Sequence, residues 1–169
     1  PTDQPAGGPD LEGVGKAAYV LDNNEDGAAA SRFVQWLGNA NFGTNRFEDD
    51  TMGMVRELKS NSQSYVANKL YHADGTASSG DNPVDFSAYR YLGFWYRGSG
   101  TALNLSVALK DKNGKDTKIT VPIGTDTDWR YFCYPLSDAV LTALTGLNFD
   151  LGKTGVAVYL DDLLMSVLN

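Results

Sequence analysis

The residues best suited to chemistry lie in one aromatic run, Tyr89 to Arg97. Aromatic residues fit the pleated surface of a β-strand, and successive strand side chains point to opposite faces. Trp95 and Arg97 therefore share one face, while Leu92 and Phe94 form an apolar face on the other side. A sugar ring can stack its C–H face on an aromatic ring while its hydroxyl groups accept hydrogen bonds from arginine. The run therefore predicts a saccharide-binding face on an open sheet.

Other aromatic and polar residues could extend this face. Tyr65, Lys69 and Tyr71 have the even spacing that places them on one side of a strand expected over 65–72. If that strand lies beside the one expected over 89–97 or the one over 103–109, these side chains would join the indole in one groove. The predicted ligand-binding residues are Trp95, Arg97, Tyr65, Lys69, Tyr71, Asn104 and Trp36.

The sequence offers little for catalysis. His72 is the only histidine, and it follows an aromatic strand, which favours a surface or hydrogen-bonded role over that of a general base. Cys133 is the only cysteine, which excludes an internal disulfide and a cysteine-based zinc site. Many aspartates lie in predicted turns, where they favour local hydrogen bonds. We therefore expect a protein that is not an enzyme. The alternatives are a polysaccharide hydrolase or lyase on a β-sandwich, and a cell-surface adhesion or scaffold domain.

Composition limits the possible partners. The chain has 169 residues, of which 42% are hydrophobic and 21% charged, as expected for one globular domain. Its net charge of −7 argues against binding nucleic acid or an anionic membrane, because no basic cluster is available to displace counterions. No run of 18 apolar residues is present, so no membrane span is expected. The Gly- and Pro-rich residues 1–16 resemble a linker, and residues 17–169 form the predicted domain.

Short apolar or alternating runs separated by Gly and Asn turns predict an all-β fold. The run 103–109 alternates strictly, and Asn113-Gly114 predicts a hairpin turn to a second alternating run at 118–123. The runs 54–59 and 65–72 are expected to form another hairpin, and 138–144 to form one or two helical turns. The pattern predicts an antiparallel β-sandwich, most simply a jelly roll. Further strands are expected at 17–21, 32–37, 89–97, 129–136, 147–151 and 156–165.

A succession of motifs resembles the jelly-roll carbohydrate-binding modules of plant-cell-wall-degrading enzymes, above all family 11 and its β-glucan-binding relatives. Their order and spacing agree over about residues 18–167, although each motif alone is mostly strand pattern. The matching stretches are Val20–Gly27, Tyr91–Arg97, Asp128–Phe132, Tyr134–Ser137 and Val158–Leu163.

The resemblance implies non-catalytic binding of a β-1,4-linked or mixed-linkage glucan, with xyloglucan as one candidate, on the concave sheet. It supports Tyr65 as a ligand contact, because a ligand tyrosine occupies the matching strand of the family. It implies a structural calcium ion at Asp22, Glu25 and Asp161, whose hard oxygen ligands suit Ca²⁺. It further implies a secreted or cell-surface protein, with a glycoside hydrolase tethered in the same polypeptide and a polysaccharide as partner.

Overall fold

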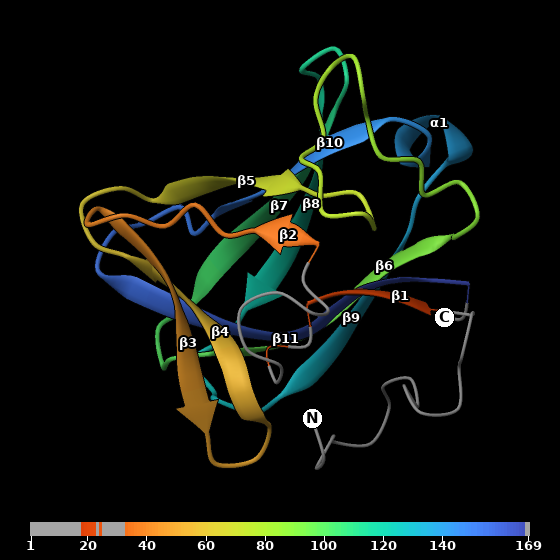
Figure 1. Cartoon of the computed structure of the whole chain (residues 1–169). Coiled ribbons are helices and arrows are strands. Elements are labelled where there is room, and N and C mark those ends of the chain that lie inside the picture. Colours follow the sequence, from red (N-terminus) through yellow and green to blue (C-terminus); the bar gives the residue numbers. More distant parts are fainter. Residues whose placement is uncertain (1–17, 23, 25–32, 168–169) are drawn as a thin grey trace.

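The computed structural model describes residues 18–22, 24 and 33–167, so the linker predicted over 1–16 lies outside the described residues. Two antiparallel sheets pack face to face as a β-sandwich, which confirms the predicted fold class (Figure 1). The first sheet has the order β3 (Phe42–Asp49), β4 (Gly53–Ser60), β11 (Val156–Ser166), β6 (Tyr91–Gly98) and β9 (Arg130–Pro135), and β1 (Ala18–Asp22) also pairs with β11. The second has the order β2 (Val34–Gln35), β5 (Tyr65–Leu70), β10 (Leu144–Asp150), β7 (Leu103–Asp111) and β8 (Asp116–Ile123).

Alternation along the strands fills the space between the two sheets. Leu92 and Phe94 of β6 are fully buried in the main core, as their side of the aromatic run predicts. Leu105 and Val107 of β7 belong to the same core from the second sheet, while Ser106 between them points outward. The six-stranded sheet therefore has its inner face closed by the core, and the same holds for the five-stranded sheet.

Local turn signals are confirmed. β7 and β8 form a hairpin through residues 111–115, where Gly114 has a φ of +81°. That conformation suits glycine, because a Cβ is rarely tolerated there. α1 is a single helical turn, Asp138–Leu141, and its N-cap Ser137 accepts a hydrogen bond from the backbone N–H of Val140. In the part of the chain that the structure describes, no helix has the length and apolarity needed to cross a bilayer.

The predicted hairpin of 54–59 with 65–72 is wrong. β4 pairs with β3, a mostly polar strand that was not predicted from the sequence. β4 and β5 belong to different sheets, and the segment between them crosses from one to the other. The backbone N–H groups of Asn61, Ser62 and Gln63 all donate to the carbonyl of Asn41, which fixes this crossing. A short polar connection therefore joins two layers rather than two paired strands.

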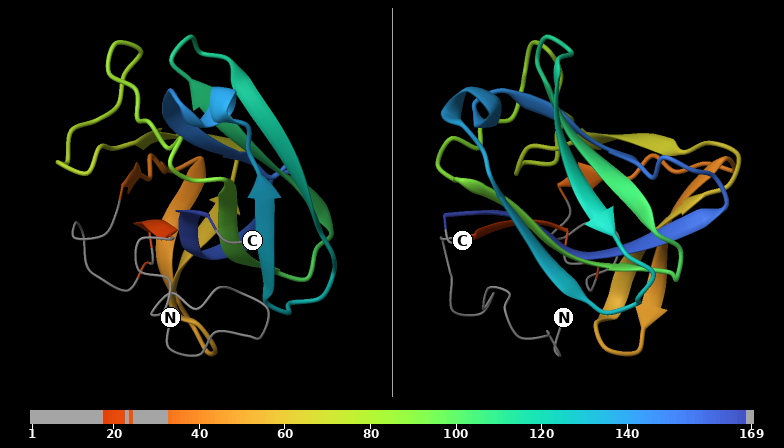
Figure 2. Two further views of the ribbon diagram at one scale, coloured as in Figure 1. Left: turned by 90° about the vertical axis from the view of Figure 1, so that its right-hand side faces the viewer. Right: turned by 180° about the vertical axis from the view of Figure 1, so that it is seen from behind.

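The outer face of the five-stranded sheet is bordered by loops at one end. The loop 71–84 and the β7–β8 turn rise beside each other beyond the ends of β5 and β7 (Figures 1 and 2). They lie close together, since a Cβ placed on Gly80 would be 3.0 Å from the carbonyl oxygen of Lys112. These loops limit the open surface of that sheet at this end.

Candidate functional site

The structure buries Trp95, the residue on which the sequence analysis relied most. Its side chain points away from the main core, as predicted, but it is only 1% exposed. It lies in a second apolar cluster on the outer side of the six-stranded sheet with Met52, Val55 and Tyr159, and the Tyr131 ring packs edge-on against it at 5.3 Å. The expected open groove shared by Trp95 and Tyr65 is therefore wrong, because the indole face is covered and the tyrosine belongs to the other sheet.

Arg97 is engaged in the same cluster. Its Nε donates to Oδ1 of Asp49 at 3.0 Å, and its guanidinium lies 4.0 Å from the ring centre of Tyr159. The indole Nε1 of Trp129 donates to the other oxygen of Asp49 at 3.0 Å. Burial raises the pKa of Asp49, but hydrogen bonds from the Met52 backbone and these side chains outweigh it and lower that pKa overall. Arg97 is therefore occupied by protein groups, and its predicted role in holding sugar hydroxyls is not supported.

Trp36 also has a structural role. It is half-buried, its ring stacks on Phe149 at 5.8 Å, and its Nε1 donates to Oδ2 of Asp22 at 2.8 Å. The guanidinium of Arg56 lies 5.0 Å from its ring centre and donates to the same carboxylate at 3.1 Å. Two of the predicted stacking residues, Trp36 and Trp95, therefore stabilise the fold instead.

A hollowed surface lies instead on the outer face of the five-stranded sheet. Two hollows of about 320 and 300 Å³ adjoin there, because Ala67, Lys110 and Asn148 line both of them. We call the combined surface the trough. The remaining lining residues are Leu37, Asn68, Lys69, Ser78, Ser79, Gly80, Thr145 and Gly146 for the first hollow, and Tyr65, Ser106, Ala108, Asp116, Lys118, Phe149 and Asp150 for the second.

The strand pairing explains why the surface is hollow at this place. Ala67 of β5, Asn148 of β10 and Ala108 of β7 lie side by side across the sheet. Gly146, in the neighbouring position of β10, adds no side chain. Small side chains at the centre and longer ones around them leave a depression across the strands.

Tyr65 supplies the aromatic contact of the trough. Its side chain is 54% exposed, whereas the large aromatic residues of the main core and of the second cluster are buried or half-buried. Asp150 of β10 pairs with Tyr65, and Ser106 of β7 pairs with Asp150, so the three residues lie side by side across the strands. A phenol ring beside carboxylate and hydroxyl groups can stack on a sugar ring while its neighbours hydrogen-bond the hydroxyls.

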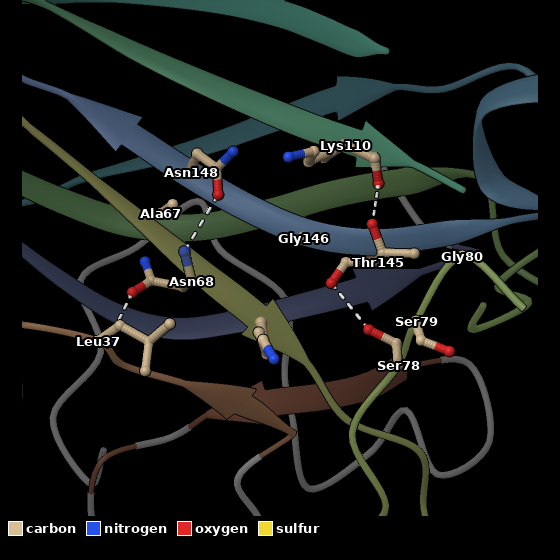
Figure 3. A pocket seen from close by; sticks show the side chains of 11 residues that line it. Leu37, Ala67, Asn68, Ser78, Ser79, Gly80, Lys110, Thr145, Gly146 and Asn148 are labelled. Carbon is tan, nitrogen blue, oxygen red and sulfur yellow. Dashed lines mark hydrogen bonds between the residues drawn. The ribbon is translucent and has the colours of Figure 1, made fainter. Parts of the chain in front are cut away.

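Hydrogen bonds hold the polar groups of the trough in place (Figure 3). Oδ1 of Asn148 accepts from the backbone N–H of Asn68 at 3.1 Å, so its Nδ2 remains as the donor of that amide. Oδ1 of Asn68 accepts from the backbone N–H of Leu37 at 3.0 Å, and the Ser78 hydroxyl donates to the carbonyl of Thr145 at 2.8 Å. The trough is therefore largely preformed, as ligand sites usually are.

The remaining predicted contacts divide between the trough and its surroundings. Lys69 lines the first hollow. Asn104 is exposed on the same face of β7 but lines a separate hollow with Lys153 and Gly152. Tyr71 is half-buried just beyond β5 and lines none of these hollows. The structure thus brings together Tyr65 and Lys69 of the predicted set.

The polar residues that β10 and β8 contribute to the trough were not among the predicted ligand contacts. Asn148 and Asp150 lie on β10, which separates β5 from β7, and Lys118 lies on β8. Alternation along 103–109 and 118–123 correctly places Ser106 and Lys118 on an outward face. It contains no information about which strand lies between them and Tyr65.

The predicted calcium ligands occupy different environments. Oδ2 of Asp22 is taken by the ion pair with Arg56, and Glu25 lies outside the described residues. Asp161 is fully buried, accepts from Nδ2 of Asn24 at 3.2 Å through Oδ1, and has no hydrogen-bond partner at Oδ2. Within the described part of the chain, no group of three or more histidine, cysteine or acidic side chains could hold a metal ion.

The carboxyl group of Asp161 is difficult to ionise in this environment. Its burial, together with the charge of the neighbouring Asp162, raises the pKa of Asp161 to about 9. A nearby cation would favour the ionised form. Asp161 Oδ2 and Asn24 Oδ1 are both buried oxygens without a hydrogen-bond partner, which is the donor chemistry that Ca²⁺ prefers.

Solved structures with a similar fold include carbohydrate-binding modules and part of an agarase. A family 11 carbohydrate-binding module of a cellulosomal cellulase of Clostridium thermocellum matches 88% of this chain and 94% of its own at a TM-score of 0.58 and 14% identity. A mutant family 29 module complexed with mannohexaose matches 89% of this chain and 91% of its own, at 0.58 and 9%. An exo-β-agarase matches 88% of this chain at 0.63 and 13% identity, but this chain spans only 24% of it.

At these low identities the likeness is one of fold, and in fold it confirms the resemblance to family 11 modules. No family model matches the chain, and no curated protein sequence matches it. The comparisons therefore establish the architecture of the chain and not the identity of its ligand.

Proposed function

We propose that the protein binds a polysaccharide chain in the trough, without catalysis. The observation that carries this proposal is the preformed hollow with one exposed aromatic ring, Tyr65, and fixed polar groups around it. A hollow can hold a single glycan chain, whereas the surface of a crystalline polysaccharide is flat and would suit a flat binding face better. A chain lying across the strands would contact Tyr65 at one position and Asn148 and Lys110 at others.

We propose a β-1,4-linked or mixed-linkage glucan, such as xyloglucan, as the ligand. A family 11 module with this fold was solved in complex with a β-1,3-1,4-mixed-linked tetrasaccharide, and other modules of the same fold are described as binding mannohexaose or xylan. Equatorial hydroxyl groups can accept from Nδ2 of Asn148 and the ammonium of Lys110. The role of such a secreted domain would be to keep a tethered glycoside hydrolase near its polymer, which raises the effective concentration of substrate.

Affinity electrophoresis tests this function. Native gels containing mixed-linkage β-glucan, xyloglucan, galactomannan or xylan should retard the protein in at least one β-glucan gel. The same incubations should produce no new reducing ends, since the proposal includes no hydrolysis. Migration unchanged by every polysaccharide would refute glycan binding, and release of reducing ends would favour the hydrolase alternative.

We also propose that one calcium ion stabilises the fold at Asp161 and Asn24, because both present buried oxygens without a partner. A ligand that binds only the folded state stabilises it by about 2.7 kcal/mol at a hundred times its Kd. The Tm should therefore rise with added CaCl₂ and fall in EDTA, as measured by calorimetry. Asp161→Asn should abolish the calcium-dependent change. Equal Tm values of the unsubstituted protein in CaCl₂ and EDTA would contradict the site.

A further inference from the structure

The charge of the trough differs from the charge of the chain. The chain has 21 acidic and 14 basic side chains, counted as Asp and Glu against Lys and Arg. The trough reverses this balance, because three lysines and two aspartates line its two hollows: Lys69, Lys110 and Lys118, with Asp116 and Asp150. A locally cationic surface on an acidic protein can attract anionic groups to that surface.

The pairing of the strands brings the three lysines together. Lys69 of β5 and Lys110 of β7 pair with Gly146 from its two sides, which puts their Cα atoms roughly 10 Å apart with no side chain between them. Lys118 of β8 pairs with Ala108, the residue two positions before Lys110 on the same face. The ammonium groups therefore border one depression.

In the described part of the chain, no ion pair fixes these ammonium groups, although Asp116 of β8 pairs with Lys110 across the two strands. Within the residues that the structure describes, Lys69, Lys110 and Lys118 make no ion pair or side-chain hydrogen bond. Lys153, outside the trough, donates to the carbonyl of Ala102 at 2.9 Å. Of the two aspartates, Asp150 already accepts from the backbone N–H of Gly152 at 2.8 Å.

We infer that the trough prefers a β-glucan chain bearing acidic groups, carboxylates or sulfate esters, over a neutral chain. This inference rests on the proposed function, because it presupposes a polysaccharide in the trough. Tyr65 contacts the apolar face of a sugar ring, and the lysines pair with the acidic substituents. An ammonium is a compact charge on a flexible stem, so it can follow substituents that are irregularly spaced along the chain.

Three soluble polymers with the same β-1,4-glucan backbone test the inference. Hydroxyethylcellulose is neutral, carboxymethylcellulose carries carboxylates, and cellulose sulfate carries sulfate esters. We expect at least one of the anionic polymers to bind about tenfold more tightly than the neutral one in 20 mM salt. Each exposed ion pair contributes little, but several of them together can supply this difference. This advantage should shrink at 500 mM salt, where screening is strong. The two anionic polymers distinguish carboxylate from sulfate as the preferred group.

Substitution of the lysines tests whether the trough is responsible. The double variant Lys110→Gln with Lys118→Gln should lose most of the preference, about fivefold or more. Its affinity for hydroxyethylcellulose should fall much less, because a glutamine at position 110 can still donate a hydrogen bond to a sugar hydroxyl group. Lys59→Gln on β4, an exposed lysine of the other sheet, is the matched control and should change nothing. Both variants should keep the Tm of the unsubstituted protein, because none of these side chains is buried.

The outcomes separate the inference from the proposed function. Equal affinity for the neutral and anionic polymers would overturn the inference and leave glycan binding intact. A preference unaffected by the double variant, or lost equally in Lys59→Gln, would also overturn it. No binding to any of the three polymers would contradict the proposed β-glucan function itself, and the inference with it.

Discussion

Tyr65→Ala should weaken binding of the β-1,4-glucan oligosaccharide cellohexaose at least about tenfold while leaving the Tm unchanged. An aromatic residue that a bound ligand covers commonly contributes more than about 1.4 kcal/mol, which is a factor of ten in affinity. Tyr65 is 54% exposed and belongs to neither apolar cluster. Its truncation therefore removes a ligand contact without opening a cavity. Isothermal titration calorimetry with cellohexaose would measure the loss.

Tyr65→Phe is the matched control for this substitution. It keeps the ring for stacking and removes only the hydroxyl group, so most of the affinity should remain. Equal affinities of Tyr65→Ala and the unsubstituted protein would contradict a stacking role for this residue. A large loss in Tyr65→Phe would instead assign the contact to the hydroxyl group.

Trp95→Ala should unfold the protein more easily rather than remove a ligand contact. Truncating a buried tryptophan typically costs about 3–5 kcal/mol of unfolding free energy, because a cavity remains. For a chain of this size that corresponds to a Tm lowered by roughly 6–20 °C. The indole is 1% exposed and packs against Met52, Val55 and Tyr159, which would lose their contacts. Thermal unfolding followed by circular dichroism measures the change.

The folded fraction of Trp95→Ala should still bind the glycan normally. The Tm of Trp95→Phe should lie between those of Trp95→Ala and the unsubstituted protein. These controls separate the structural role from the binding role. A Trp95→Ala variant with unchanged Tm and no affinity for glycan would restore the sequence-based assignment of this residue.

The sequence predicts the fold well because its signals are local. Alternation in the run 103–109 and the Asn113-Gly114 turn define the β7–β8 hairpin without reference to distant residues. Alternation in the run 89–97 likewise correctly places the Trp95 and Phe94 side chains on opposite faces of the sheet. Alternation says which face a side chain occupies, but whether that face is open depends on what else covers it. Met52 lies in the turn between β3 and β4, and Tyr159 lies on β11, so only the folded sheet places them beside Trp95.

The binding surface was predicted only in part, because it depends on non-local pairing. Tyr65 pairs with Asp150 across β5 and β10, and Ser106 pairs with Asp150 from β7. The residues of each pair lie far apart in the sequence, and no motif links them. Tyr65 and Lys69 could be predicted from their own strand. Asn148, which lies between that strand and β7, could not.

The central claim is that the trough on the five-stranded sheet, and not the outer face of the six-stranded sheet, holds the glycan. An NMR titration of the labelled protein with cellohexaose tests it most directly. Amide shifts should concentrate at Ala67, Ala108 and Asn148 in the trough. Shifts concentrated around Arg97 and Tyr159, with the trough amides unmoved, would contradict the account.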